Sequence, residues 1–424
     1  MRARTIVLPV VLVAVLAACT GTPSAPSDRA ASRRTRGPAD LLVLGSASGV
    51  IALDAADGSI PFSGGGVPAF TDWSTVFTAT PGEGTTVLRA IRTDTGQIVS
   101  TATLRGDLDV RVASQGGERV ALMAPLPAGV SPWTPRPRAS TNVVVADPTG
   151  STKTMRFHLQ GNFEPEAFSA DGDKLFMISY VPPTRPYAYR VVSLDLGEGE
   201  VYPVFGRQKQ WVDTMTGTRL MQVPAPDGAF LFTLYTNQPP GYARGFDTAQ
   251  AAAGRPVAFV HTLNLNIGQA VCVGLPRALW GGNPANEALA ASPADSRLYV
   301  VDSARGVIAV MSSDRLRVIQ TARVDFGSRV TGAQTEAAVS HDGTSLYVST
   351  GAALMRLDAT SLVPTARWNL PEPVSGMGFS DDGTRLYLTV PGEIELVNPS
   401  SGHQILTIPA AGVEGIRYVG TLGG

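Results

Sequence analysis

Short runs of alternating apolar and polar residues fill most of the chain, and turn residues interrupt them at regular intervals. One unit recurs: a small or apolar stretch, an Asp-Gly type of turn, and then a run rich in Leu, Tyr, Phe and Val. The copies are FSADGDKLFMIS (168–179), VPAPDGAFLFTL (223–234), ASPADSRLYVVD (291–302), VSHDGTSLYVST (339–350), FSDDGTRLYLTV (379–390) and the weaker QGGERVALM (115–123). This pattern is typical of β-hairpins, because Gly and Asp tolerate the positive φ that a tight turn requires.

A second hairpin accompanies each unit, and eight can be counted along the chain. They cover residues 51–60, 88–100, 143–155, 191–202, 261–273, 308–320, 355–368 and 394–406. Together the two hairpins make a four-stranded antiparallel unit, with strands a to d, that repeats on average every 48 residues. A repeat of that length is typical of propeller blades. We therefore predict an all-β fold, a β-propeller of eight blades, with seven as the alternative if one early hairpin is only a loop.

The two ends of the repeat region predict how the ring closes. LLVLGS (41–46) and GVIALD (49–54) have the character of strands b and c, so the first blade lacks its own strand a. GIRYVG (415–420) at the other end has the character of a lone strand a. Pairing this last strand with the first blade closes the ring, whereas leaving it unpaired would expose two sheet edges.

The repeats S-x-D-G-x-x-L-Y-V resemble those of YVTN-type and related WD-like bacterial propellers. The resemblance covers the chain after residue 115 best. It implies a propeller fold and leaves function open, because one fold serves many functions. The Gly-His and Trp-Asp signatures of true WD repeats do not occur as a pair, so that family is not assigned.

The N-terminal residues have the order of an export signal. Arg2 and Arg4 precede an apolar run over residues 6–15, and the tetrapeptide LAAC ends at Cys19. This segment resembles the signal and lipobox of bacterial lipoproteins. The resemblance implies removal of residues 1–18 and diacylglyceryl attachment to Cys19, which would anchor the protein stably through two or three acyl chains. The alternative is an ordinary secretory peptide with a chance cysteine.

Composition then separates the chain into parts and narrows the classes of partner. Residues 19–40 are rich in Ser, Thr, Ala and Pro and are expected to form a flexible tether to a propeller domain at 41–424. The 34 Lys and Arg residues balance 35 Asp and Glu residues, which argues against a nucleic-acid partner.

Once Cys19 carries lipid, Cys272 is the one remaining thiol, so no intramolecular disulfide can form, and its Val-Cys-Val context predicts a buried strand position.

Candidate catalytic chemistry is sparse. The chain has four His residues and none of the common nucleophile, phosphate-loop or zinc motifs, so we expect no metal site and no cofactor. The repeated Asp171, Asp227, Asp295, Asp342 and Asp382 fall in the a–b turn of each blade, where an Asp side chain accepts backbone N–H groups. Some propellers of similar type are lactonases or lactonising enzymes, but no such motif can be matched here.

The longest insertions fall between strands b and c of three consecutive blades, at 124–140, 180–189 and 236–256. Two long d–a crossings, 205–219 and 274–287, emerge on the same face of a propeller. These segments carry Trp133, Arg136, Arg138, Arg185, Tyr187, Tyr189, Arg207, Trp211, Tyr242, Arg244, Arg277 and Trp280. Because Trp, Tyr and Arg are enriched at binding hot spots, one hypothesis is a recognition surface over blades three to six. The alternative is that the aromatic rings pack the loops down and the arginines are solvated.

These features favour a non-catalytic binding or scaffolding module, anchored in the cell membrane and facing outside the cytoplasm. The expected partner is a protein or a cell-envelope glycan. The alternative is a lactonase-like hydrolase or isomerase with its site in the central channel.

Overall fold

The computed structural model describes residues 38–47, 49–69, 73–127, 129–206, 214–215, 218–236, 257–328, 330, 332–351 and 353–421. Cys19, the signal segment and most of the tether lie outside the described residues. Residues Gly37–Gly424 form one compact unit, separate from Met1–Arg36.

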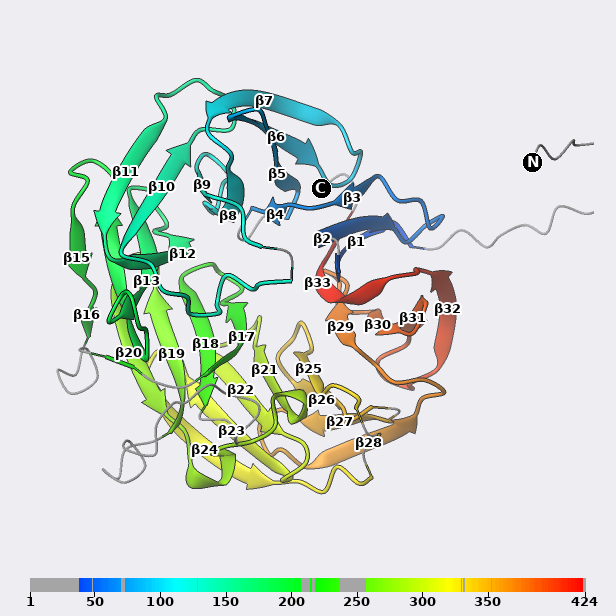
Figure 1. The fold of residues 1–424 in the computed structure, drawn as a ribbon. Coiled ribbons are helices and arrows are strands. Elements are labelled where there is room, and N and C mark those ends of the chain that lie inside the picture. Colours follow the sequence, from blue (N-terminus) through cyan, green and yellow to red (C-terminus); the bar gives the residue numbers. More distant parts are fainter. Residues whose placement is uncertain are drawn as a thin grey trace, which may run out of the picture. The chain divides into compact units, whose positions relative to one another are not determined.

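Eight antiparallel sheets make up this unit, and each is one blade of a propeller (Figure 1). From the inner to the outer strand, blade 1 contains β33 (Val413–Thr421), β1 (Asp40–Ser46), β2 (Gly49–Asp54) and β3 (Phe62–Gly64). Blade 2 contains β4 (Val67–Pro68), β5 (Thr75–Gly82), β6 (Thr85–Arg92) and β7 (Ile98–Arg105). Blade 3 contains β8 (Asp109–Ala113), β9 (Val120–Met123), β10 (Ser140–Ala146) and β11 (Met155–Gln160). Blade 4 contains β12 (Asn162–Phe168), β13 (Lys174–Val181), β14 (Ala188–Asp195) and β15 (Val201–Pro203).

The second half of the ring follows the same plan. Blade 5 contains β17 (Thr218–Pro224), β18 (Phe230–Thr236), β19 (Ala258–Asn264) and β20 (Gln269–Gly274), with the short β16 (Phe205–Gly206) added parallel to β20. Blade 6 contains β21 (Glu287–Ala291), β22 (Arg297–Asp302), β23 (Val307–Ser312) and β24 (Arg317–Arg323). Blade 7 contains β25 (Glu336–Val339), β26 (Ser345–Ser349), β27 (Ala353–Asp358) and β28 (Pro364–Asn369). Blade 8 contains β29 (Gly376–Phe379), β30 (Leu386–Val390), β31 (Glu393–Val397) and β32 (Gln404–Pro409). The prediction of an eight-bladed all-β propeller is confirmed.

The hydrophobic pattern explains why the blades stack. The middle strands are buried on both faces, as in RLYVVD of β22, because another blade covers each side. The outer strands alternate exposed and half-buried positions, as in RVIQTAR of β24. Each core cluster joins neighbouring blades: Tyr299 and Val301 of blade 6 pack with Leu346 and Val348 of blade 7. The core is therefore a ring of apolar layers between sheets.

The repeated Ser and Asp residues build the a–b turns. In blade 7, Ser340 Oγ donates to Asp342 Oδ1 at 2.6 Å, and this carboxylate also accepts the Thr344 N–H at 3.0 Å. The Ser340 hydroxyl in turn accepts the backbone N–H of Ser345 at 2.9 Å. The same arrangement recurs in blades 4 and 8, and Asp227 and Asp295 likewise accept the N–H two residues on. All five repeated aspartates are turn residues, as predicted.

In blades 6 and 7, the Tyr of the repeat links its blade to the next one. Tyr299 donates its hydroxyl to the Ala359 carbonyl of blade 7 at 3.0 Å, and Tyr347 donates to the Pro399 carbonyl of blade 8 at 2.9 Å. Both tyrosine rings are buried. One side chain thus fills the space between two sheets and satisfies a carbonyl in the c–d turn of the next blade.

Blade 1 is completed by the C-terminal strand, as predicted. β33 pairs antiparallel with β1 over Asp40–Ser46, and Figure 1 shows it (red) between β1 and β29. Gly376 and Gly378 of β29 make this approach close, because a Cβ at Gly376 would stand 2.5 Å from the backbone nitrogen of Ile416. The sheet edges at the two chain ends are therefore joined.

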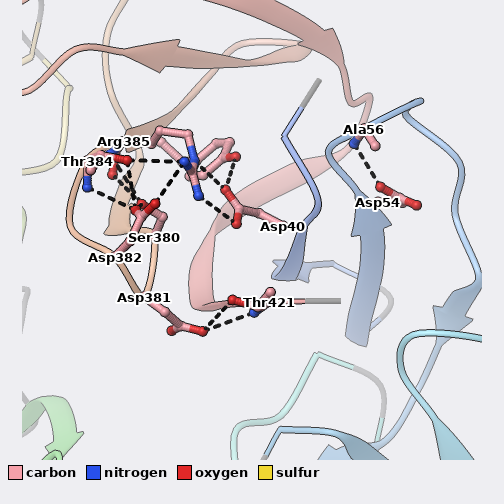
Figure 2. A network of polar contacts seen from close by, with 10 residues as sticks. Asp40, Asp54, Ala56, Ser380, Asp381, Asp382, Thr384, Arg385 and Thr421 are labelled. Atoms are coloured by element: carbon pink, nitrogen blue, oxygen red, sulfur yellow. Dashed lines mark hydrogen bonds and ion pairs between the residues drawn. The ribbon is translucent and has the colours of Figure 1, made fainter. Parts of the chain in front are cut away.

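A polar network reinforces the closure (Figure 2). Asp40 is 2% exposed and accepts two hydrogen bonds from Arg385 of blade 8, at 2.7 and 3.0 Å. The Tyr387 hydroxyl donates to the same carboxylate at 2.6 Å. At the same end of β33, Thr421, the register partner of Asp40, donates its N–H and hydroxyl to Asp381 at 3.0 Å. Asp40, which the sequence analysis placed at the end of the tether, is thus part of the propeller, because its carboxylate pairs with a residue far along the chain.

Candidate functional site

The inner strands carry an unusual number of charged residues at their N-terminal ends. Each inner strand begins on the face where the b–c loops and d–a crossings also lie, which we call the crossing face. Arg111, Glu164, Arg219, Glu287 and Glu336 all stand at or close to the start of an inner strand. The crossing face therefore brings charged side chains from several blades around the mouth of the channel.

One charged cluster joins blades 3 and 4. Glu164 is 1% exposed, and its carboxylate accepts a hydrogen bond from Arg111 at 2.9 Å and one from Arg138 at 3.3 Å. Arg111 also donates to Asp109 at 3.0 Å and to the Ala124 carbonyl at 2.6 Å. Arg138, which lies on the b–c loop of blade 3, donates to the Phe163 carbonyl at 2.8 Å. A buried carboxylate between two arginines fixes the loop to the ring.

A second cluster joins blades 4 and 5. Glu166 lies 3.5 Å from Arg219 and accepts a hydrogen bond from Gln222 at 3.1 Å. Burial raises the pKa of the Glu166 carboxyl, while Arg219 opposes that shift. The guanidinium of Arg219 lies 3.4 Å from the ring centre of Trp133, so the indole covers this ion pair from the b–c loop of blade 3.

An aromatic layer lies beneath these ion pairs. Tyr189 and Tyr235 stack with ring centres 5.1 Å apart, and Tyr235 meets His261 edge-on at 6.4 Å. Burial lowers the pKa of His261 to about 4, helped by the positive charge of Arg219, so this imidazole is neutral at physiological pH. Cys272 is buried against Met215, and burial raises its thiol pKa to about 12. Its predicted buried strand position is confirmed.

Comparisons with known proteins relate the chain to other propellers. No family model matches it, and no curated protein matches it. AztD from Citrobacter koseri superposes with a TM-score of 0.52 at 12% identity, over 91% of this chain and 98% of that chain. The dihydro-heme d1 dehydrogenase NirN, solved in complex with DHE, gives 0.51 at 14% identity, over 91% and 75%. Sqt1 of Saccharomyces cerevisiae gives 0.50 at 11% identity, over 89% and 90%.

The likeness is one of fold. At these identities it shows a propeller and carries no residue roles, so the site has to be argued from its own geometry.

The predicted recognition residues fall into four groups. Trp133, Tyr189 and Trp280 pack against core clusters, and Trp280 also donates its indole N–H to the Leu275 carbonyl at 2.8 Å. Arg138 is held by its ion pair, and the backbone carbonyl of the half-buried Arg136 accepts a hydrogen bond from Asn162 at 2.5 Å. Arg185, Tyr187 and Arg277 are exposed. Arg207, Trp211, Tyr242 and Arg244 lie outside the described residues.

A separate cavity opens on the crossing face between blades 7, 8 and 1. It has a volume of about 650 Å³, and its polar lining residues are Glu336, Glu414, Arg417, Gln334 and Ser375, with aliphatic side chains beside them. A smaller cavity of about 350 Å³ lies further along the inner strands, and Ile416 and Arg417 line both. We call the larger one the mouth cavity.

Sequence reasoning missed the charged residues of the inner strands. Their signal was weak but present: Glu287 opens EALAAS and Glu336 opens EAAVSH, where the repeat otherwise has small or apolar residues. In the part of the chain that the structure describes, no three His, Cys, Asp or Glu residues gather to hold a metal ion. No helix found there is long and apolar enough to cross a membrane.

Proposed function

We propose that this protein is a lipid-anchored propeller outside the cytoplasm that binds a protein or a cell-envelope polymer through its crossing face, without catalysis. Two features support the proposal. The N-terminal segment has the order of a lipoprotein signal ending at Cys19. The crossing face of blades 3 to 5 presents exposed aromatic and cationic side chains on a loop that is already held in place.

That loop, residues 182–187, is the observation that carries the proposal. The Tyr187 N–H donates to the Val181 carbonyl at 3.1 Å, which closes the loop on itself. The Pro183 carbonyl accepts the Arg138 N–H at 2.9 Å and the Asn162 side chain at 3.0 Å, which ties the loop to blade 3 and to β12. Tyr187 is nevertheless 63% exposed, and Arg185 is also exposed. Because the loop is already ordered, binding a partner costs the loop little conformational entropy.

The binding surface can be tested by capture from intact cells. A photo-crosslinking side chain placed at position 187 should capture a specific partner, and Tyr187→Ala with Arg185→Ala should weaken binding of that partner by about tenfold or more, as hot-spot truncations do. Tyr202→Ala is the matched control, because Tyr202 is also exposed, at 45%, but lies on the outer strand β15. Equal binding by the loop variant and the control would contradict the proposal.

The anchor has its own test. Replacing Cys19→Ser removes the thiol that the lipid would modify, so the protein should leave the membrane fraction or accumulate as an unprocessed precursor. Fractionation of cells that express the full chain, followed by mass measurement of its N-terminus, distinguishes these outcomes. Mature Cys19→Ser protein that stays in the membrane fraction would show that lipid on this residue is not the anchor.

A further inference from the structure

A second binding site lies away from the loop of blade 4. We propose that the mouth cavity binds an α-amino acid zwitterion, either free or as the two ends of a short peptide, with Arg417 holding the carboxylate and Glu336 the ammonium group. The proposal is independent of the loop surface and goes beyond it, because the two sites lie on different blades.

Size and lining suit a small ligand. A volume of about 650 Å³ lies within the roughly 300–1,000 Å³ range of small-molecule sites. The walls combine aliphatic residues, such as Val374, Val390 and Ile416, with a few polar groups. Such a lining fits an aliphatic body that carries charged groups at defined points.

Arg417 is placed to meet an anion. Along β33 the register with β1 shifts between Ile416 and Tyr418, so Arg417 occupies a β-bulge, a feature that redirects a side chain out of the regular ladder. The guanidinium passes over Gly45, where an added Cβ would stand 2.9 Å from Nε. Within the described residues it makes no hydrogen bond and no ion pair, although it lines both cavities. Its donors are therefore available for a carboxylate.

Glu336 supplies the complementary charge. It opens β25 and lines the same cavity, and the described residues offer it neither a hydrogen bond nor an ion pair. Burial raises its pKa to about 7, and Arg417 is the one group that acts in the opposite direction. Glu414 of β33 also lines the cavity, but it is exposed to solvent. Of the other strands next to β25, β21 carries Glu287, whereas β26 and β29 carry no charged residue.

The two charges together select the ligand class. Arg417 and Glu336 face one cavity but do not form an ion pair with each other, since none is found within 4.0 Å. A ligand with only a carboxylate would leave the half-buried Glu336 without a partner, which is costly. A ligand with only an ammonium group would leave the donors of the exposed Arg417 to solvent. A zwitterion with an aliphatic side chain satisfies both groups and the walls at once.

Titration calorimetry on the purified mature protein tests the site with four probes: L-leucine, the dipeptide Leu-Leu, leucinamide and 4-methylpentanoate. L-leucine or the dipeptide should bind, and whichever binds identifies the source of the zwitterion. Leucinamide lacks the carboxylate and 4-methylpentanoate lacks the amine, so each should bind at least about tenfold more weakly. Affinity for the zwitterion should rise about tenfold from pH 6 to pH 8, as Glu336 ionises around pH 7.

Variants keep the proposal falsifiable. Arg417→Gln should abolish binding, and Glu336→Gln should weaken it and remove the pH dependence. Arg317→Gln, an exposed arginine on the outer strand β24, is the control and should bind as the parent does. Equal affinity for leucine and its single-charge analogues would overturn the proposal. So would the absence of binding by both leucine and the dipeptide at 10 mM, which corresponds to about 2.7 kcal/mol or less of standard binding free energy. Circular dichroism should show that each variant is folded.

Discussion

A single buried carboxyl group illustrates how much one residue can cost this fold. Glu287 of β21 stands directly opposite Asp302 of β22 and is 3% exposed. Neither of its carboxylate oxygens has a hydrogen-bond partner among the described residues. Burial and the negative charge of Asp302 raise the pKa of Glu287 to about 8, although Arg305 opposes the shift. The propeller therefore holds this side chain protonated at neutral pH.

This shift predicts how stability depends on pH. The unfolded chain releases the Glu287 proton near pH 4.5, whereas the folded protein keeps it until about pH 8. The contribution of Glu287 to folding stability therefore falls as the pH rises from 4.5 to 8. Glu287→Gln replaces the titrating carboxyl with a neutral amide, so the stability of the variant relative to the parent should increase from pH 5 to pH 8. Urea unfolding of both proteins at these two pH values measures the gain, and a constant difference would contradict the assignment.

The charged residues of the inner strands also show what the sequence could not reveal. A Glu at the start of a small-residue strand is visible in the sequence, but its partner is not. Glu164 pairs with Arg111 and Arg138 from another blade, and Arg417 shares a cavity with Glu336 although the two are far apart in the chain. Such pairs depend on where the ring brings distant blades together, which residue spacing alone does not determine.

At the scale of the strand and turn, the repeat was highly informative. The Ser and Asp of the a–b turn and the Tyr of the following strand each have a local or next-blade partner that recurs, so the same residues appear at the same spacing. Predicting the eight c–d hairpins succeeded for this reason. The b–c loops do not repeat, and the sequence alone left open whether their aromatic residues pack or bind. Trp133 illustrates why the sequence could not decide, since its ring packs against a core cluster and also covers Arg219.

The repeated Tyr gives a prediction for one blade interface. Tyr347→Phe keeps the buried ring but removes the hydroxyl that donates to the Pro399 carbonyl, leaving that acceptor without this bond. The free energy of unfolding should fall by about 1 kcal/mol. Tyr202→Phe is the control, because the Tyr202 hydroxyl donates to the exposed Glu198 within the same blade. This substitution should change the free energy of unfolding by close to zero. Chemical denaturation measures the free energy of unfolding of both variants. Equal changes in the two variants would show that the Tyr347 hydroxyl does not stabilise the contact between blades.

At the scale of the whole molecule, the ring depends on a contact between the two ends of the propeller. β33 supplies the inner strand of blade 1, and the Asp40 carboxylate joins blade 1 to blade 8 through Arg385 and Tyr387 (Figure 2). The chain runs from each blade into the next, including from β32 of blade 8 into β33, so the pairing of β33 with β1 inside blade 1 closes the ring without a covalent connection. The network therefore stabilises the step that turns eight sheets into a closed ring.

Removing the Asp40 carboxylate should open this joint. Asp40→Ala leaves the buried Tyr387 hydroxyl without its acceptor and removes the bidentate partner of Arg385, whose side chain is 25% exposed. Loss of a mostly buried pair should lower the free energy of unfolding by about 3 kcal/mol. Asp94→Ala breaks the pair with Arg92, whose side chain is 47% exposed, inside one hairpin and should cost less than about 1 kcal/mol. Hydrogen exchange adds a local test, because β1 and β33 should lose protection in Asp40→Ala before the other blades do. If the two Asp variants were equally stable and β33 kept its protection, pairing between β1 and β33 alone would be sufficient to close the ring.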